Sequence, residues 1–165
     1  MINILKYPHE IIMQKSSTWT RNDKIDGYND IEKFEHDYVR LMLSEKGMGL
    51  AANQIGITKR FFAIGHETLD TFQKHAIIWN PQVINFSKDK VIDVEGCLSF
   101  KGTFVKVERP KEIEVQYETT QGETKTAILD GMESKCFQHE LDHLEGDGST
   151  SPSLVQLPQQ SLSYC

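Results

Sequence analysis

The architecture of this chain is indicated most clearly by residues 131–145, which read GMESKCFQHELDHLE. Side chains recur in this stretch at helical spacing, on two faces. One face carries Met132, Cys136, His139 and His143, and the other carries Phe137, Leu141 and Leu144. Asp130 and Glu133 have the spacing of a capping box, and Gly146 is a stop signal. We therefore predict a helix from Gly131 to Glu145.

His139 and His143 stand four residues apart in this predicted helix, in a His-Glu-x-x-His pattern. Two imidazoles at this spacing project from one face, so they can bind the same metal ion. Glu140 is placed to handle the proton of a metal-activated water. The bare pentapeptide also arises by chance as two ordinary surface histidines, so it does not by itself establish a metal site.

A hydrolytic metal site needs a third protein ligand and an open position for water. Only 22 residues follow His143, and the one His or Glu among them, Glu145, is too close in sequence. The third ligand is therefore expected upstream, where Cys97 lies in the segment EGCLS of residues 95–99. Taken singly, Cys97 reads more readily as a buried structural cysteine.

The rest of the sequence indicates an α+β domain. Residues 30–46 carry apolar side chains at helical spacing, with a capping box at Asn29 and Glu32 and a stop at Gly47. Runs typical of strands lie at 60–64, 76–80, 91–94 and 103–107, and residues 112–117 and 124–129 form a predicted antiparallel hairpin. Strands followed by a helix that packs across them are typical of the α+β class. The segment GMGLAANQ, residues 47–54, reads alone as a tight loop.

Composition excludes several classes of protein. The chain has 165 residues and a formal net charge of −6, which favours one domain and argues against a strongly basic nucleic-acid binder. Its apolar runs are too short for a membrane-spanning helix, and the first residues lack the apolar core of a signal peptide. Three widely spaced cysteines, Cys97, Cys136 and Cys165, predict free thiols in a reducing compartment.

Three segments in order, Gly47–Gln54, Glu95–Ser99 and Gln138–His143, together resemble the signatures of the peptide deformylase family. The similarity runs from Ile4-Leu5-Lys6-Tyr7-Pro8 to Gly146, which implies a catalytic domain over 1–146. The resemblance implies antiparallel or mixed β-sheets packed around a central metal-binding helix. Residues 147–165 depart from the family, because a polar stretch replaces the usual C-terminal helix. We expect this tail to be irregular and dispensable for chemistry on a short peptide.

The resemblance also implies roles for individual residues. Cys97, His139 and His143 would bind one divalent metal ion, and Glu140 would be the general acid and base. The side-chain amide of Gln54 and the backbone N–H of Leu98 would stabilise the oxyanion. Met48, Gly49, Glu95, Gly96 and Cys136 would contact the substrate, beside the apolar part of Lys135. A mixed thiolate and imidazole set suits Fe²⁺ or Zn²⁺, with Ni²⁺ or Co²⁺ as substitutes.

The implied substrates are nascent N-formyl-methionyl polypeptides, and the products are formate and a free amino terminus. The implied location is the cytoplasm, the host cytoplasm for a viral protein, or an organelle. Any ribosome contact would not use the usual C-terminal helix, and the sequence indicates no nucleic-acid or membrane site. Phe100-Lys101 also replaces a proline that many relatives carry after the cysteine signature.

Two other functions agree less well with these residues. A short metallopeptidase would normally take its third ligand downstream of the histidines, and this chain offers none there. A catalytically silent, metal-stabilised binding module would have no need to retain Glu140 and Gln54. We also expect an ion pair between Glu95 and Arg109 that holds the cysteine loop; the alternative is two unrelated surface charges.

Overall fold

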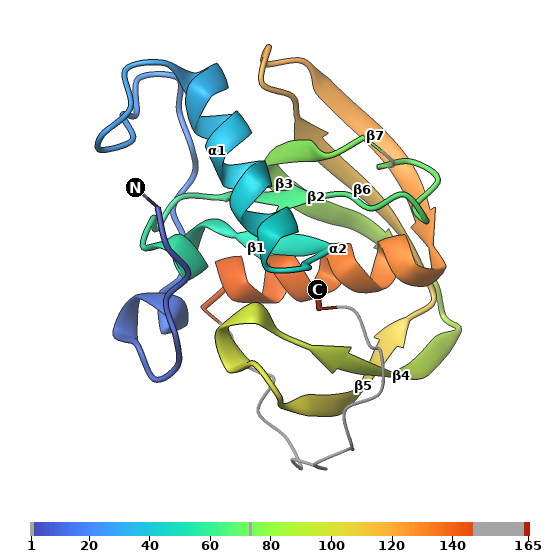
Figure 1. Cartoon of the computed structure of the whole chain (residues 1–165). Coiled ribbons are helices and arrows are strands. Elements are labelled where there is room, and N and C mark those ends of the chain that lie inside the picture. Colours follow the sequence, from blue (N-terminus) through green and yellow to red (C-terminus); the bar gives the residue numbers. More distant parts are fainter. Residues whose placement is uncertain (1, 73, 147–163) are drawn as a thin grey trace.

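The computed structural model describes residues 2–72, 74–146 and 164–165. Two antiparallel sheets lie on opposite sides of the helix α2 (Figure 1). The strands of the five-stranded sheet, in spatial order, are β1 (Gly49–Ala51), β2 (Phe61–Ile64), β3 (Ala76–Phe86), β6 (Glu112–Glu118) and β7 (Thr124–Asp130). The second sheet pairs β4 (Lys90–Gly96) with β5 (Phe104–Pro110).

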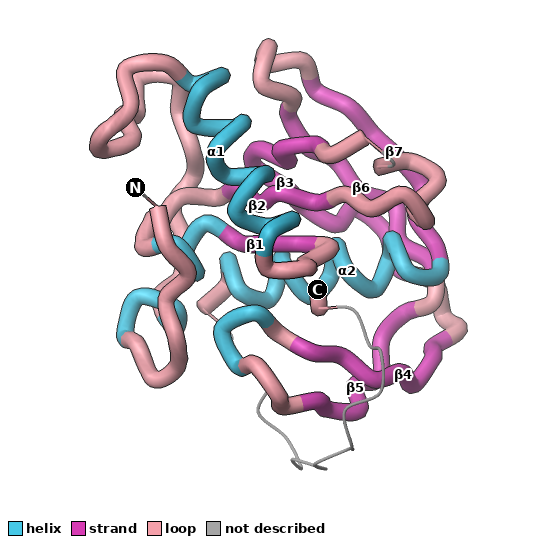
Figure 2. Tube along the Cα trace, in the orientation of Figure 1, coloured by secondary structure: helices cyan, strands magenta, loops and turns pink. Residues whose placement is uncertain are grey.

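Within the described residues, two α-helices and three short 3₁₀ turns complete the fold, and Figure 2 shows the helices in cyan and the strands in magenta. The α-helices are α1 (Ile31–Ser44) and α2 (Gly131–Leu144), and short 3₁₀ turns lie at η1 (Glu10–Met13), η2 (Ala52–Ile55) and η3 (Leu98–Phe100). Helix α2 contacts strands of both sheets, including β1, β7 and β5. This confirms the predicted α+β fold with sheets around a central helix. Neither α-helix of the described residues has the length and apolar character that a membrane crossing requires.

The predicted helices are present, but their first turns differ from prediction. Asp30, not Asn29, caps α1, because its carboxylate accepts a hydrogen bond from the Glu32 N–H at 3.0 Å. Asp130 occupies the N-cap position of α2 but makes no side-chain capping bond. Glu133 turns away instead and accepts hydrogen bonds from the N–H groups of the 71–72 loop, at 2.5 and 3.0 Å. The predicted capping boxes were therefore wrong, because Asp30 takes the cap position of α1 and the 71–72 loop engages the Glu133 carboxylate.

Two strand predictions need correction. Strand β3 continues through Pro81 to Phe86, well beyond the predicted end at Asn80. Its pairing with β6 shifts register between Trp79 and Gln82, and Asn80 adopts a positive φ of 48°. Proline is tolerated at such a bulge because no ladder hydrogen bond is required of its nitrogen. Residues 49–51, predicted as part of a loop, form the fully buried strand β1 against β2.

The core is built around the aromatic side chain of Phe61 on β2. Its ring lies 4.5–5.9 Å from the ring centroids of Trp19, Phe34, Tyr38 and Trp79. These rings join α1 to one face of the large sheet, so burial of apolar area there holds the two elements together. On α2, Cys136 and Phe137 are fully buried, whereas Met132 is 41% exposed and lies outside the predicted packing stripe.

We predict that Phe61→Ala lowers the free energy of unfolding by about 3–5 kcal/mol, because it leaves a cavity among four aromatic rings. Urea unfolding measures this change. Phe86→Ala is the matched control, since Phe86 is 56% exposed at the end of β3 and should cost about 0.5 kcal/mol or less. Similar losses in both variants would contradict the assignment of Phe61 to the core.

Candidate active site

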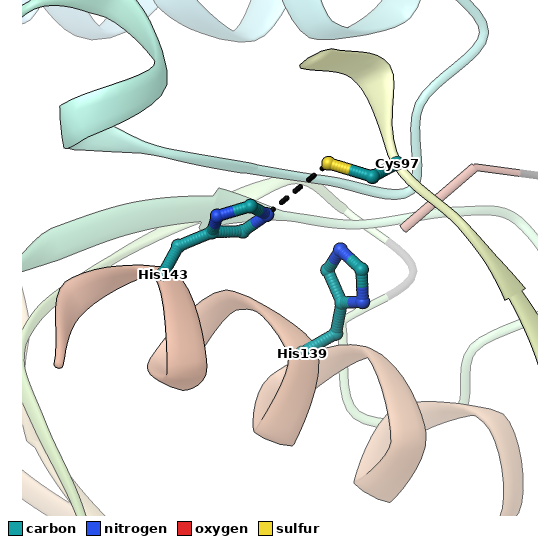
Figure 3. Close-up of side chains that lie close together, drawn as sticks. All are labelled: Cys97, His139 and His143. Atoms are coloured by element: carbon teal, nitrogen blue, oxygen red, sulfur yellow. Dashed lines mark hydrogen bonds between the residues drawn. The ribbon is translucent and has the colours of Figure 1, made fainter. Parts of the chain in front are cut away.

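Helix α2 and the end of β4 bring three potential metal ligands together. His139 and His143 lie one turn apart on α2, and Cys97 follows β4 directly (Figure 3). The Cys97 Sγ lies 3.2 Å from Nε2 of His143, and one ligand atom from each of the three residues falls within 4.8 Å of the others. All three side chains are buried. The structure thus brings together the three predicted ligands.

Glu95 fixes the orientation of one imidazole. Its Oε2 lies 2.9 Å from Nδ1 of His139, which leaves Nε2 of the same ring facing Cys97. Within the described part of the chain, this buried Nε2 has no hydrogen-bond partner. A carboxylate behind a histidine is the arrangement that orients the ring and raises its basicity as a metal ligand.

A divalent cation fits this cluster. A buried, unpartnered imidazole nitrogen is costly unless a ligand satisfies it. Burial lowers the pKa of His143 well below its ordinary value, so the ring is neutral and able to coordinate. Burial also raises the pKa of the Cys97 thiol to about 12, and a bound cation would favour its thiolate. Three protein ligands would leave one position open, as in catalytic zinc sites.

Glu140 lies beside this cluster without a protein partner. It is fully buried, and neither carboxylate oxygen has a hydrogen-bond partner among the described residues. Burial raises its pKa well above the ordinary value. A Cβ on Gly49 would collide with the Glu140 carboxylate, so the glycine permits the close approach of β1 to α2. A carboxyl group in such a setting is suited to accepting and returning a proton.

Gln54 is held with its amide nitrogen toward Cys97. Its Oε1 accepts a hydrogen bond from the Ala51 N–H at 2.8 Å, which fixes which end of the amide faces the site. Its Nε2 donates to the Ser99 hydroxyl at 3.1 Å and lies 3.5 Å from Cys97 Sγ. Leu98 begins η3 immediately after Cys97 and is fully buried. Both predicted oxyanion residues therefore lie next to the cluster.

The predicted ion pair between Glu95 and Arg109 is confirmed. Arg109 donates to the two carboxylate oxygens at 2.5 and 2.8 Å, and also to Asp142 Oδ2 on α2 at 2.8 Å. Burial alone would raise the pKa of Glu95, but hydrogen bonds from Arg109 and His139 outweigh it and bring the value to about 2. The Glu95 carboxylate is engaged by these partners and so positions His139, whereas its predicted contact with substrate stays a prediction.

Three other predicted substrate residues, Met48, Gly96 and Cys136, lie next to Tyr164 and Cys165. The Met48 N–H donates to the carbonyl oxygen of Tyr164 at 2.7 Å, and the Gly96 carbonyl accepts from the Cys165 N–H at 3.2 Å. A side-chain hydrogen bond with Cys165, together with burial, raises the pKa of Cys136 well above its ordinary value. Sequence reasoning did not anticipate these contacts. Lys135 turns toward Asp93, with Nζ 2.9 Å from Oδ2.

Asn53 is a positioning residue that sequence reasoning missed. Its side-chain nitrogen donates to the backbone oxygens of Ile12, at 3.0 Å, and of His143, at 2.5 Å. This contact ties η2 to the turn of α2 that carries the last ligand. The feature of the sequence that could have indicated this role is the position of Asn53 directly beside Gln54 in the segment 47–54.

We predict that Arg109→Ala lowers the free energy of unfolding by about 3–5 kcal/mol, because it leaves the buried Glu95 carboxylate without its cationic partner. Urea unfolding tests this. Lys90→Ala is the control on the same hairpin, since its pair with Glu108 is exposed and contributes about 1 kcal/mol or less. Equal effects of the two substitutions would refute the structural role of Arg109.

Comparison with known proteins agrees with this geometry. The sequence matches the family described as polypeptide deformylase over residues 1–151. A peptide deformylase of Thermotoga petrophila is 33% identical over 146 residues, covering 88% of this chain and 83% of that protein. The crystal structure of peptide deformylase from Thermotoga maritima has a TM-score of 0.78 at 32% identity, covering 88% of this chain and 92% of the other.

A further similar structure is a class I type b peptide deformylase from Acinetobacter baumannii with Met-Ala-Ser bound. It has a TM-score of 0.78 at 26% identity and covers 88% of this chain and 93% of that one. The Cys97, His139 and His143 cluster lies within the matched residues, on a fold shared with these enzymes. The family match spans nine-tenths of the sequence, and the chain therefore belongs to the peptide deformylase family.

Proposed function

We propose that this enzyme removes the formyl group from the N-formyl-methionyl end of newly made polypeptides and releases formate. The observation that carries the proposal is the buried cluster of Cys97, His139 and His143 with the unpartnered Glu140 carboxylate beside it. The Acinetobacter relative, with Met-Ala-Ser bound, supports a peptide that begins with methionine as the ligand. Such substrates place the reaction wherever formylated chains are made.

Cys97, His139 and His143 would hold one divalent cation, for which Fe²⁺ and Zn²⁺ are the leading candidates and Ni²⁺ or Co²⁺ substitutes. When bound, the cation supplies Lewis acidity, which polarises the formyl carbonyl and makes a coordinated water more acidic. Glu95 supports this site from behind, because it holds the His139 ring with Nε2 directed inward.

Glu140 would move the proton during hydrolysis. Its carboxylate takes a proton from the attacking water as the new C–O bond forms at the formyl carbon. It then returns that proton to the departing amine nitrogen as the C–N bond breaks, which gives formate and a free amino terminus. Burial is consistent with this role, because it makes the ionised carboxylate a stronger base.

Gln54 and Leu98 would stabilise the negative charge that develops on the formyl oxygen. The Gln54 amide is already oriented by Ala51, so its donor needs no rearrangement during the reaction. The backbone N–H of Leu98 would act as the second donor. Met48, Gly49, Gly96 and Cys136 would line the substrate site, where a small buried space accepts a formyl hydrogen and rejects an acetyl methyl.

The direct test is formate release from formyl-Met-Ala-Ser by anaerobically prepared protein, with metal content measured on the same sample. We expect turnover that falls with removal of the cation by a chelator and returns when Fe²⁺ or Zn²⁺ is added back. Stoichiometric metal without any formate release would overturn the proposal and favour a silent binding module.

We predict that Glu140→Gln retains the metal but loses activity by about 10²–10⁴-fold, because an amide of similar size cannot accept the proton. Metal analysis and steady-state kinetics on the same preparation separate the two effects. Near-normal turnover in this variant would remove Glu140 as the base.

We predict that Cys97→Ala loses the bound metal, whereas Cys136→Ala retains it and most of the activity. Only Cys97 lies with both histidines in the cluster, although Cys136 is equally buried on α2. Metal content after dialysis is the measurement. The reverse pattern would overturn the ligand assignment.

A further inference from the structure

Tyr164 and Cys165 lie as an extended segment between Gly47 and Met48, which precede β1, and Gly96 at the end of β4. Tyr164 forms isolated parallel bridges with Gly47 on one side and Gly96 on the other. Its carbonyl accepts from the Met48 N–H, and the Cys165 N–H donates to the Gly96 carbonyl. The segment therefore links the chain before β1 to the end of β4, and Figure 1 shows the C-terminal end of the chain beside α2.

Side chains hold the same segment. The Tyr164 ring stacks on Phe104 of β5 with centroids 5.5 Å apart. Cys165 is 2% exposed and belongs to the buried core together with Cys136, and its proximity raises the pKa of the Cys136 thiol. The segment thus contacts three of the residues assigned to substrate binding, which are Met48, Gly96 and Cys136.

An extended peptide that adds between these two backbone segments needs the same main-chain partners. Strand addition takes its affinity from edge N–H and C=O groups and its specificity from the side-chain pockets beside them. The Met48 N–H and the Gly96 carbonyl are the edge groups here, and the segment already uses both. A substrate peptide and the segment cannot make these two hydrogen bonds at the same time.

We infer that Tyr164–Cys165 is an internal competitor that occupies the position of a substrate peptide between Met48 and Gly96 and must be displaced before a substrate binds. This inference rests on the proposed deformylase activity. Only molecules from which the segment has been displaced can bind substrate, so the apparent Kd equals the intrinsic Kd divided by the fraction of such molecules. The chemical step after binding is unchanged. The device therefore raises KM and leaves kcat unaltered.

The kinetic test uses Cys165→Pro in the full chain, because proline lacks the N–H that donates to Gly96. We expect KM for formyl-Met-Ala-Ser to fall by about 5-fold or more, with kcat within about two-fold of the parent. Cys165→Ser is the matched control, since it keeps the N–H and a side chain of similar size, and its KM should stay near the parent value. An unchanged KM in Cys165→Pro would overturn the inference.

A second measurement follows the segment without turnover. Alkylation of Cys165 by iodoacetamide, read by mass spectrometry of the terminal peptide, should be slow in the metal-loaded protein. Saturating Met-Ala-Ser should accelerate it, and Tyr164→Gly, which removes the stacking on Phe104, should do the same without peptide. Labelling that is indifferent to Met-Ala-Ser would identify the segment as a permanent strand and refute displacement.

These two readouts separate failure of the inference from failure of the proposed activity. Absence of formate release in every variant would count against the deformylase assignment, while Cys165 labelling would still report whether peptide displaces the segment. Normal turnover with unchanged KM and unchanged labelling would count against the competitor alone.

Discussion

The buried carboxylate of Glu95 is the contact on which the rest of the site depends. It accepts hydrogen bonds from Arg109 of the neighbouring strand β5, and it faces Nδ1 of His139 on α2. A charge removed from water is tolerated only when it is paired and hydrogen-bonded, so these partners have to lie close. Because Glu95 stands two residues before Cys97, the same contact fixes the thiol and the imidazole relative to each other. One carboxylate thus joins the small sheet to the central helix.

The opposite side of α2 is fixed by main-chain contacts and by close approach. Gly49 allows β1 to pack against Glu140, where any larger side chain would collide with the carboxylate. Asn53 donates to the His143 carbonyl and so holds the last turn of the ligand helix. The site therefore lies on α2 between the two sheets, and each sheet contributes a different part of it. The small sheet supplies the thiol and the ion pair, and the large sheet supplies the space around Glu140.

The backbone beside the site resembles an incomplete sheet. The chain before β1 and the end of β4 both present main-chain hydrogen-bonding groups, and the Tyr164–Cys165 segment fills the space between them. Exposed strand edges favour pairing with another extended chain. The main-chain groups that can bind an extended substrate peptide can also bind the enzyme's own Tyr164–Cys165 segment. Substrate binding is therefore coupled to the position of this segment.

Local patterns in the sequence were sufficient for α2 and for most strands, and the resemblance to a known family indicated the three segments that carry the proposed metal ligands, Glu140 and Gln54. Helical spacing alone put His139 and His143 on one face, because that relation depends only on the backbone period. The path of the chain decided the rest. It made Asp30 rather than Asn29 the cap of α1, turned Glu133 toward the 71–72 loop, and left Met132 exposed. It also brought Tyr164 to Gly96 and the Asn53 side chain to the His143 carbonyl. Residues far apart in sequence meet only after the sheets have formed. Propensities that act over a few residues therefore cannot predict such contacts.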